Sequence, residues 1–257
     1  MKNNIKKIIF AVCIVIVAAC IGYIAYYYGK KASNEKVYKE AQKKVEKAVK
    51  EEPEVPAEPQ AEEPKEEIPV DFASLQEMNP DIYAWIQIPG TNVNYPIVQS
   101  TGDDSYYLDH TIEGKEGYPG SIYTEKLNSK EFTDFNTVIY GHDMKDGTMF
   151  KDLHKYEDLA FLQQNQTVII YTPEKKLTYQ IFAAVVYDDR HIMKTYDFND
   201  TTQRQSFLDS VYGIRSMNSN VLSEPAVNTD SHILTLSTCI GSMPDNRFIV
   251  EAVQVNE

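Results

Sequence analysis

The chain has 257 residues, of which 42% are hydrophobic and 25% charged, and this composition excludes a collagen, a mucin or a wholly disordered protein. Residues 1–70 hold 12 Lys and 11 Glu, whereas residues 71–257 hold 13 Lys and Arg against 27 Asp and Glu. Such an acidic C-terminal part repels phosphate backbones, which disfavours nucleic-acid binding. Cys13 and Cys20 lie in an apolar run, so Cys239 is the single thiol of the C-terminal part and a disulfide framework is excluded.

An uncharged apolar stretch covers residues 8–28. At a rise of about 1.5 Å per residue, its 21 residues are long enough to cross a bilayer core of about 30 Å. We therefore predict a short cytoplasmic tail at residues 1–7 and a transmembrane anchor at residues 8–28.

The orientation of this anchor receives opposing signals. Lysines before the stretch and tyrosines at its far end favour an N-terminus inside, but more lysines follow the stretch than precede it. We expect the remainder of the chain outside, because the next segment has an extracytoplasmic character. Val17-Ala-Ala-Cys20 resembles a lipoprotein cleavage box, so processing at Cys20 stays open, although the apolar run continues for eight residues beyond it and favours an uncleaved anchor.

Residues 29–70 are expected to form a charged and Pro/Glu-rich extracytoplasmic linker. Lys, Glu, Ala and Val alternate over residues 31–50 without Pro or Gly, which predicts a charged, solvent-exposed helix. Five prolines and eight Glu follow in residues 51–69, a composition typical of an extended spacer. We therefore expect a chain that starts near Asp71 to fold by itself.

A folded domain is expected over residues 71–257. Asp71 is a suitable N-cap for a short helix that ends at Met78. Residues 158–165 and 201–216 also predict helices. Short runs rich in Val, Ile, Tyr and Thr predict eight strands: 84–88, 93–98, 120–124, 137–140, 167–172, 177–187, 233–238 and 248–255. This mostly β pattern predicts a closed barrel.

Cys239 lies at the end of a predicted strand, on the same face as Thr235 and Ser237. A thiol that only packs is expected among apolar side chains, and a lone thiol in an oxidising compartment is a liability unless it is used. Arg247 begins the next strand and brings a positive charge, which favours a reactive thiolate. The alternative is an inert cysteine at a strand end.

His142 ends the strand-like segment that begins at Asn136, directly after Gly141. Histidine is the usual group that generates or reprotonates a thiolate near neutral pH, although a single histidine at a strand end also suits a capping role. The other four histidines are expected to be solvated: His110, His154, His191 and His232. Neither a metal nor a cofactor is expected, because the two aspartates after His142 fall short of the ligand count of a calcium loop.

Thr235-Leu-Ser-Thr-Cys239, followed by Arg247 and preceded by Tyr140-Gly-His142, resembles the signature of the sortases, the membrane-anchored cysteine transpeptidases of Gram-positive bacteria. Further segments between residues 79 and 255 are similar to class B: 79–91, 95–99, 106–108, 120–123 and the helix 201–216. The resemblance implies an eight-stranded sortase-type β-barrel with an N-terminal helix and a helix inserted before the cysteine strand.

The resemblance also implies roles for individual residues. Cys239 attacks the carbonyl of a Thr in a C-terminal sorting signal and forms a thioester, and His142 acts as acid and base. Arg247 holds the substrate or stabilises the oxyanion. Four further residues are expected to border the substrate: Ser237, Asn136, Tyr140 and Thr238.

Class B implies cleavage after Thr in a signal similar to Asn-Pro-x-Thr-Asn or Pro-x-Thr-Gly, by thiol-protease chemistry, and transfer of the surface protein to an amine of a peptidoglycan precursor or cross-bridge. The expected location is the cell membrane, single-pass, with the catalytic domain outside. Two alternatives stay open: a pilin-polymerising enzyme that uses a Lys amine, and a catalytically silent, wall-tethered binding module. A Cys–His peptidoglycan hydrolase is disfavoured, because there the cysteine opens a helix and precedes the histidine.

Overall fold

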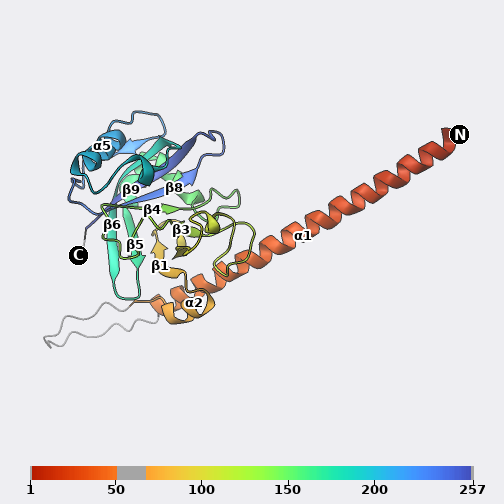
Figure 1. The fold of residues 1–257 in the computed structure, drawn as a ribbon, viewed down its shortest axis with the longest axis horizontal. Coiled ribbons are helices and arrows are strands. Elements are labelled where there is room, and N and C mark those ends of the chain that lie inside the picture. The colour runs from red at the N-terminus through yellow and green to blue at the C-terminus, as the bar shows by residue number, and fades with distance from the viewer. Residues whose placement is uncertain (1, 51–67, 256–257) are drawn as a thin grey trace.

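Eight strands form a closed ring. In this computed structural model, which describes residues 2–50 and 68–255, neighbouring strands follow the order β5-β1-β2-β3-β4-β8-β9-β6, and β6 pairs back onto β5 (Figure 1). The strands of the ring are β1 (Ile82–Gln87), β2 (Asn94–Val98), β3 (Ile122–Thr124), β4 (Asn136–Tyr140), β5 (Thr167–Tyr171), β6 (Lys176–Asp188), β8 (Ile233–Cys239) and β9 (Asn246–Gln254). The predicted closed eight-stranded barrel is confirmed. A short strand that was not predicted, β7 (Asn220–Val221), pairs with β6.

Apolar side chains pack on both faces of the barrel wall. One cluster includes the fully buried Trp85 and Leu236. A second cluster packs α5 (Thr201–Tyr212) against the wall, with Phe182 and Phe207 fully buried. The wall is therefore covered beneath α5 and is a rigid support for residues at the strand ends.

Aspartates cap two of the predicted helices. α2 (Phe72–Met78) follows Asp71, whose carboxylate accepts a hydrogen bond from the Ser74 N–H at 3.1 Å. Asp158 caps α3 (Leu159–Gln164) in the same way. Both helices therefore begin where the sequence predicts, because a side-chain oxygen satisfies N–H groups of the first turn.

The helix after β6 is shorter than predicted. α5 ends at Tyr212 rather than at residue 216, because Gly213 follows with low helix propensity and closes the last turn through its N–H bond to Asp209. Three short elements escaped prediction because none is long enough to show a periodic pattern: η1 (Tyr106–Leu108), η2 (Lys151–Glu157) and α4 (Ile192–Thr195).

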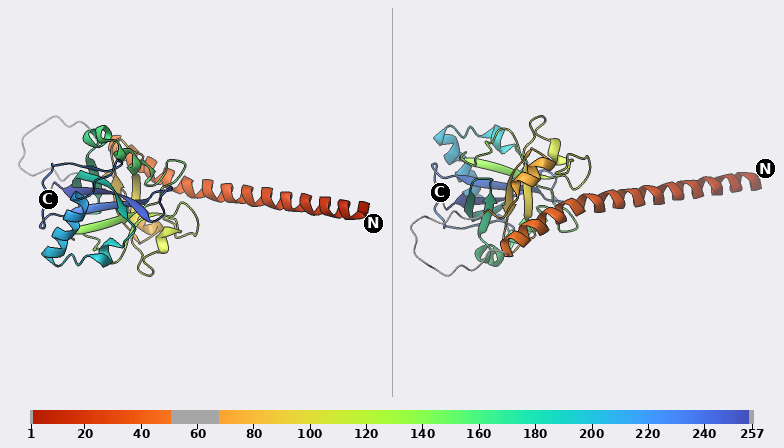
Figure 2. Two further views of the ribbon diagram at one scale, coloured as in Figure 1. Left: turned by 90° about the horizontal axis from the view of Figure 1, so that it is seen from above. Right: turned by 90° about the horizontal axis from the view of Figure 1, so that it is seen from below.

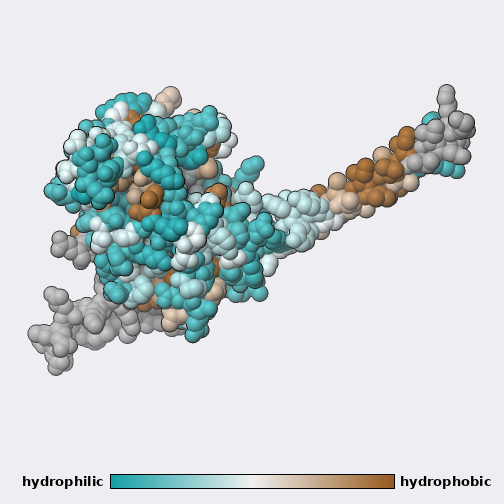
Figure 3. Space-filling model, in the orientation of Figure 1, coloured by the Kyte–Doolittle hydropathy of each residue, from teal (hydrophilic) through white to brown (hydrophobic). Residues whose placement is uncertain are grey.

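α1 (Lys2–Lys50) is one helix of 49 residues that leaves the barrel in a single direction (Figure 2). Within the part of the chain that the structure describes, it is the one helix that is long and apolar enough to cross a membrane. Its most apolar part packs against nothing and shows as a brown band in Figure 3. This exposed apolar surface is compatible with the predicted anchor.

The C-terminal part of α1 packs against the barrel, which corrects the expectation of a solvent-exposed helix over residues 31–50. Four side chains at helical spacing are buried: Asn34, Tyr38, Ala41 and Val45. The Tyr38 hydroxyl donates a hydrogen bond to the Gly120 carbonyl and accepts one from the Ile112 N–H at 3.2 Å. The predicted spacer falls mostly on residues 51–67, which lie outside the described residues.

Polar contacts extend this docked face of α1 toward loops of the barrel. Asn34 donates to the Tyr118 carbonyl at 2.9 Å, and Gln42 donates to the Asn94 carbonyl at 2.8 Å. Lys31 pairs with Asp146 at 2.5 Å, and this pair holds the pKa of Asp146 down at about 2 although partial burial opposes the shift. The helix therefore contacts two loops that border the site described next.

Candidate active site

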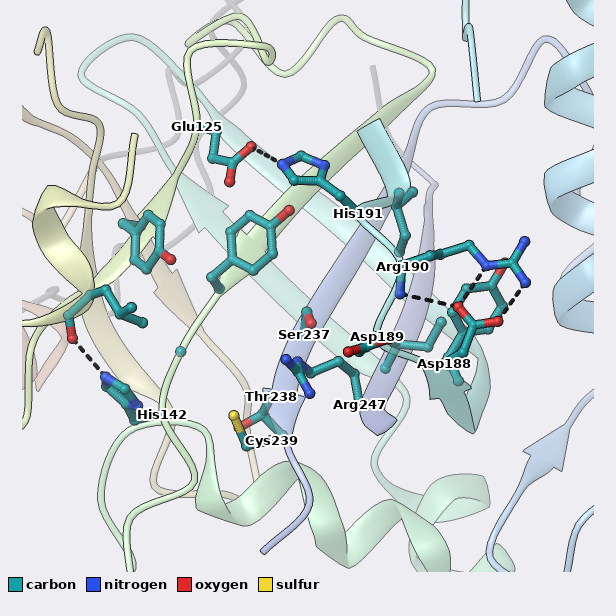
Figure 4. Close-up of a pocket in the computed structure, with 17 residues that line it drawn as sticks. Glu125, His142, Asp188, Asp189, Arg190, His191, Ser237, Thr238, Cys239 and Arg247 are labelled. Carbon is teal, nitrogen blue, oxygen red and sulfur yellow. Dashed lines mark hydrogen bonds and ion pairs between the residues drawn. The ribbon is translucent and has the colours of Figure 1, made fainter. Parts of the chain in front are cut away.

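A cleft of about 420 Å³ opens on the barrel wall where β4 and β8 end and β9 begins (Figure 4). One side of it is formed by residues 187–192, at the end of β6 and beyond. Its lining includes Cys239, His142 and Arg247 from the predicted site, and also Tyr140, Ser237 and Thr238. The fold thus brings six of the seven predicted site residues to one cleft.

The strand register explains why the cysteine, histidine and arginine meet. β4 and β8 run parallel with Tyr140 opposite Ser237, so His142 and Cys239 each lie two residues further along adjacent chains. β8 and β9 are antiparallel, with Cys239 directly opposite Arg247. Adjacent strands are about 4.8 Å apart, and paired residues share a face. Cys239 therefore has His142 on one side and Arg247 on the other.

Cys239 is the only exposed residue of β8. The other six residues of the strand are buried, including Ser237 and Thr238. The face of this strand that was predicted to be polar is therefore buried at Thr235 and Ser237, and only Cys239 at its end is exposed to solvent. A buried strand with an exposed end fixes the position of the sulfur and leaves it accessible from solvent.

His142 is oriented by a backbone carbonyl. Its Nε2 lies 2.6 Å from the Leu108 oxygen, and a carbonyl only accepts, so Nε2 carries the proton. In the neutral ring Nδ1 is then the basic nitrogen, which is the state needed to take a proton from a thiol. Gly141 permits this placement, because a Cβ there would lie 2.5 Å from Cδ1 of Ile122.

Arg247 is held by the backbone rather than by a carboxylate. Its Nη1 donates to the carbonyls of Pro244 at 2.9 Å and Asn246 at 2.8 Å. No carboxylate of residues 68–255 forms an ion pair with its guanidinium. The remaining N–H groups can therefore bind a carbonyl or an oxyanion in the cleft.

The remaining predicted residues take different places. Tyr140 stacks on Tyr123 with ring centroids 5.3 Å apart, and burial raises the pKa of both hydroxyls. Asn136 shares a strand face with Tyr140 but lies away from the cleft, fully buried beside Thr235 and Glu251. The resemblance implied that Asn136 borders the substrate, and the sequence does not show that this end of the strand is covered.

Sequence reasoning missed a group of charged side chains that lines the cleft beside the predicted residues. Nε2 of His191 lies 2.8 Å from Oε2 of Glu125, so His191 is paired rather than solvated. Burial raises the pKa of Glu125, while the neighbouring His191 opposes this shift. Asp188 and Asp189 also line the cleft, and Asp188 pairs with Arg190 at 2.5 Å (Figure 4). No local pattern could reveal a pair whose members come from separate loops.

His154, also expected to be solvated, is largely buried beneath the end of β8, with 16% of its side chain exposed. In the described part of the chain, no group of three His, Cys, Asp or Glu side chains is placed to hold a metal ion. The three groups that meet at the strand ends of the cleft are a thiol, an imidazole and a guanidinium.

The comparisons with known proteins agree with this arrangement. The sequence profile of the sortase domain matches residues 86–255. Sortase B of Listeria monocytogenes is 38% identical over 177 residues, which cover 67% of this chain and 68% of the relative. The chain therefore belongs to the sortase family, and within that family to class B.

Solved structures support the same assignment. The complex of Staphylococcus aureus sortase B with a substrate superimposes with a TM-score of 0.71 at 27% identity, covering 88% of this chain and 97% of that one. A Bacillus anthracis protein described as similar to sortase B gives a TM-score of 0.70 at 31% identity, again over 88% and 97% of the two chains. The fold is thus a sortase-type barrel, and the class activity is that of a sortase transpeptidase.

Proposed function

We propose that this sortase cleaves a C-terminal sorting signal after Thr and transfers the protein to a peptidoglycan amine. The observation that carries the proposal is the placement of Cys239 between His142 and Arg247 at one cleft. The three groups have complementary roles, because the thiol is a nucleophile, the imidazole moves protons, and the guanidinium meets negative charge.

In the first half-reaction, the sulfur of Cys239 forms a bond to the Thr carbonyl carbon, and the thiol proton moves to Nδ1 of His142. The carbonyl oxygen becomes an oxyanion, which Arg247 stabilises. When the peptide C–N bond breaks, the leaving amine takes the proton from His142, and a thioester remains. Removing a donor of this kind from an oxyanion costs about 10²- to 10³-fold in rate in comparable sites.

In the second half-reaction, an amine attacks the thioester carbonyl and gives its proton to His142. The carbon–sulfur bond breaks, a new amide bond forms, and the proton returns to the sulfur of Cys239. Atoms and charge balance over the cycle, and no cofactor is consumed. Ser237, Tyr140 and Thr238 border the path of the peptide.

The proposed organisation places the chemistry outside the membrane. Residues 1–7 form the cytoplasmic tail, residues 8–28 the anchor, residues 29–70 the linker and residues 71–257 the catalytic domain. The exposed apolar part of α1 supports the anchor, and the packing of Tyr38 adds part of the linker to the domain. The partners are surface proteins with a sorting signal and a peptidoglycan precursor or cross-bridge amine.

The test uses the full chain in detergent micelles with quenched peptides that carry Asn-Pro-x-Thr-Asn or Pro-x-Thr-Gly, with and without hydroxylamine. We expect cleavage after Thr, and a hydroxamate on that Thr when hydroxylamine intercepts the thioester. Cys239→Ala should lower the rate by at least about 10³-fold, because the nucleophile is lost.

Mass spectrometry identifies the cut bond and the acyl product. If the wild-type protein leaves every peptide uncleaved while its Cys239 thiol still reacts with a thiol reagent, the proposal is contradicted and a silent binding module is favoured. Transfer to a Lys-containing pilin peptide, but not to a cross-bridge peptide, would replace the wall acceptor with a pilin acceptor. A peptide with Thr replaced by Ala is the matched control and should stay intact.

A further inference from the structure

We propose that His154 is a positioning residue that holds the strand end carrying Cys239 in register with the loop carrying His142. This inference rests on the proposed function. The imidazole lies in η2, beneath the cleft, and stacks on Phe248 of β9 with ring centroids 5.0 Å apart. Its Nε2 lies 3.1 Å from the backbone oxygen of Cys239, and its Nδ1 lies 2.8 Å from Oε1 of Glu157.

The Cys239 carbonyl needs a partner because the strand beside it has ended. Two residues earlier, the Ser237 carbonyl points toward β4 and accepts from the Gly141 N–H at 3.1 Å. Carbonyls two residues apart in a strand point to the same side, so that of Cys239 also faces the β4 side, but β4 ends at Tyr140. His154 occupies the place of the missing ladder donor and satisfies this oxygen.

The same ring reaches the loop that follows His142. Its Nε2 lies 3.7 Å from Oδ2 of Asp143, the next residue in the chain, and Oδ1 of Asp143 pairs with Lys151 at 2.9 Å. The His142 carbonyl accepts from the Phe150 N–H at 3.0 Å, which closes this loop just before η2 begins. One side chain thus contacts the backbone of Cys239 and lies next to the carboxylate of the residue that follows His142.

Both partners of the imidazole are hydrogen-bond acceptors. A carbonyl and a carboxylate have no proton to offer, so both ring nitrogens must carry one for both bonds to form. A ring that makes both bonds carries a positive charge beside Glu157 and Asp143, with Lys151 beyond Asp143. Such a charge next to the Cys239 backbone would favour the thiolate.

The test separates these hydrogen bonds from packing. His154→Phe keeps a ring against Phe248 and removes both donors, whereas His154→Gln keeps one N–H that can reach the Cys239 carbonyl. His232→Phe is the matched control. This exposed histidine precedes β8 at the end of the strand opposite Cys239, and its ring also contacts a backbone oxygen, that of Asp134. All variants are made in the full chain in detergent micelles.

Two readouts are measured. The first is steady-state cleavage of the sorting peptide over a range of peptide concentrations, which gives the maximal rate and KM. The second is the pH profile of Cys239 alkylation by iodoacetamide, followed by mass spectrometry on the peptide that contains this cysteine so that Cys13 and Cys20 do not interfere. The alkylation profile needs no cleavage activity, so it tests His154 even where the proposed function fails.

We expect His154→Phe to lower the maximal cleavage rate about 10- to 100-fold with KM within twofold, and to shift the alkylation profile to higher pH. His154→Gln should recover much of the rate, and His232→Phe should match wild type. The inference is overturned if His154→Phe keeps the wild-type rate and alkylation profile. It is equally overturned if His154→Gln is as slow as His154→Phe and both leave the alkylation profile unchanged, since the histidine then acts by packing alone.

Discussion

Substitution of Tyr38 tests whether the C-terminal part of α1 belongs to the folded domain. The side chain is 3% exposed and packs against Tyr95 of β2, with ring centroids 5.9 Å apart. Tyr38→Phe removes only the hydroxyl, and Tyr38→Ala removes the ring as well. The pair therefore separates the hydrogen bonds from the apolar burial.

The structure sets the expected free energies. Without the hydroxyl, the Ile112 N–H and the Gly120 carbonyl lose a partner in a buried place, which costs about 1–3 kcal/mol. Removal of a buried aromatic ring costs about 3–5 kcal/mol through lost transfer energy and the cavity that remains. We therefore expect Tyr38→Phe to destabilise the protein moderately and Tyr38→Ala to destabilise it strongly.

Urea unfolding of the full chain in micelles measures both effects. Trp85, the single tryptophan, is fully buried and donates to Oδ1 of Asn94 at 2.7 Å, so its fluorescence reports on the barrel. Lys36→Ala, on the exposed face of α1, is the control and should stay within about 0.5 kcal/mol of wild type. A Tyr38→Ala protein as stable as the control would refute the docking argument.

Two further predictions concern the site and the wall behind it. Gly141→Ala should slow peptide cleavage and destabilise the protein by about 1–3 kcal/mol. The new Cβ would lie 2.5 Å from Cδ1 of Ile122 and would displace the start of the loop that carries His142. An unchanged rate in the peptide assay would contradict this prediction. Full burial raises the pKa of Glu251 to about 8, whereas the pKa of a Glu side chain in the unfolded chain is about 4.3. The folded state therefore holds a proton that the unfolded state has lost, and stability to urea should fall between about pH 5 and pH 8, by at most about 1.4 kcal/mol per pH unit. Glu251→Gln should flatten this slope, and a flat wild-type profile would count against the raised pKa.

The barrel was predictable because its signal is local. Each strand is a short run of β-branched and aromatic residues between turn residues, and the eight runs correspond to the eight strands of the ring. The cysteine, histidine and arginine each lie at or just beyond a strand end, but a strand end alone left an inert cysteine and a capping histidine open, and it was the resemblance to the sortases that singled out these three residues.

The missed features depend on contacts between distant parts of the chain. The buried face of α1 has only Tyr38 and Val45 as large apolar residues among many Lys and Glu, so its pattern is that of a solvated helix. His154 meets Cys239 across 85 positions of the chain, and no spacing rule links them. A hydrogen bond from a side chain to a distant backbone oxygen leaves no periodic mark in the sequence.

The continuity of α1 has a consequence for how substrates arrive. The helix is about 70 Å long at about 1.5 Å per residue. Tyr118, whose ring lies 5.5 Å from that of His142, shares a small hollow with Tyr23 and Tyr27 of α1. With the apolar stretch in a bilayer, the cleft would sit at a fixed height just above the lipid. For a substrate that is itself anchored in the membrane, encounter would then be a two-dimensional search, and turnover would depend on the density of that substrate per unit area of membrane rather than on its concentration in solution.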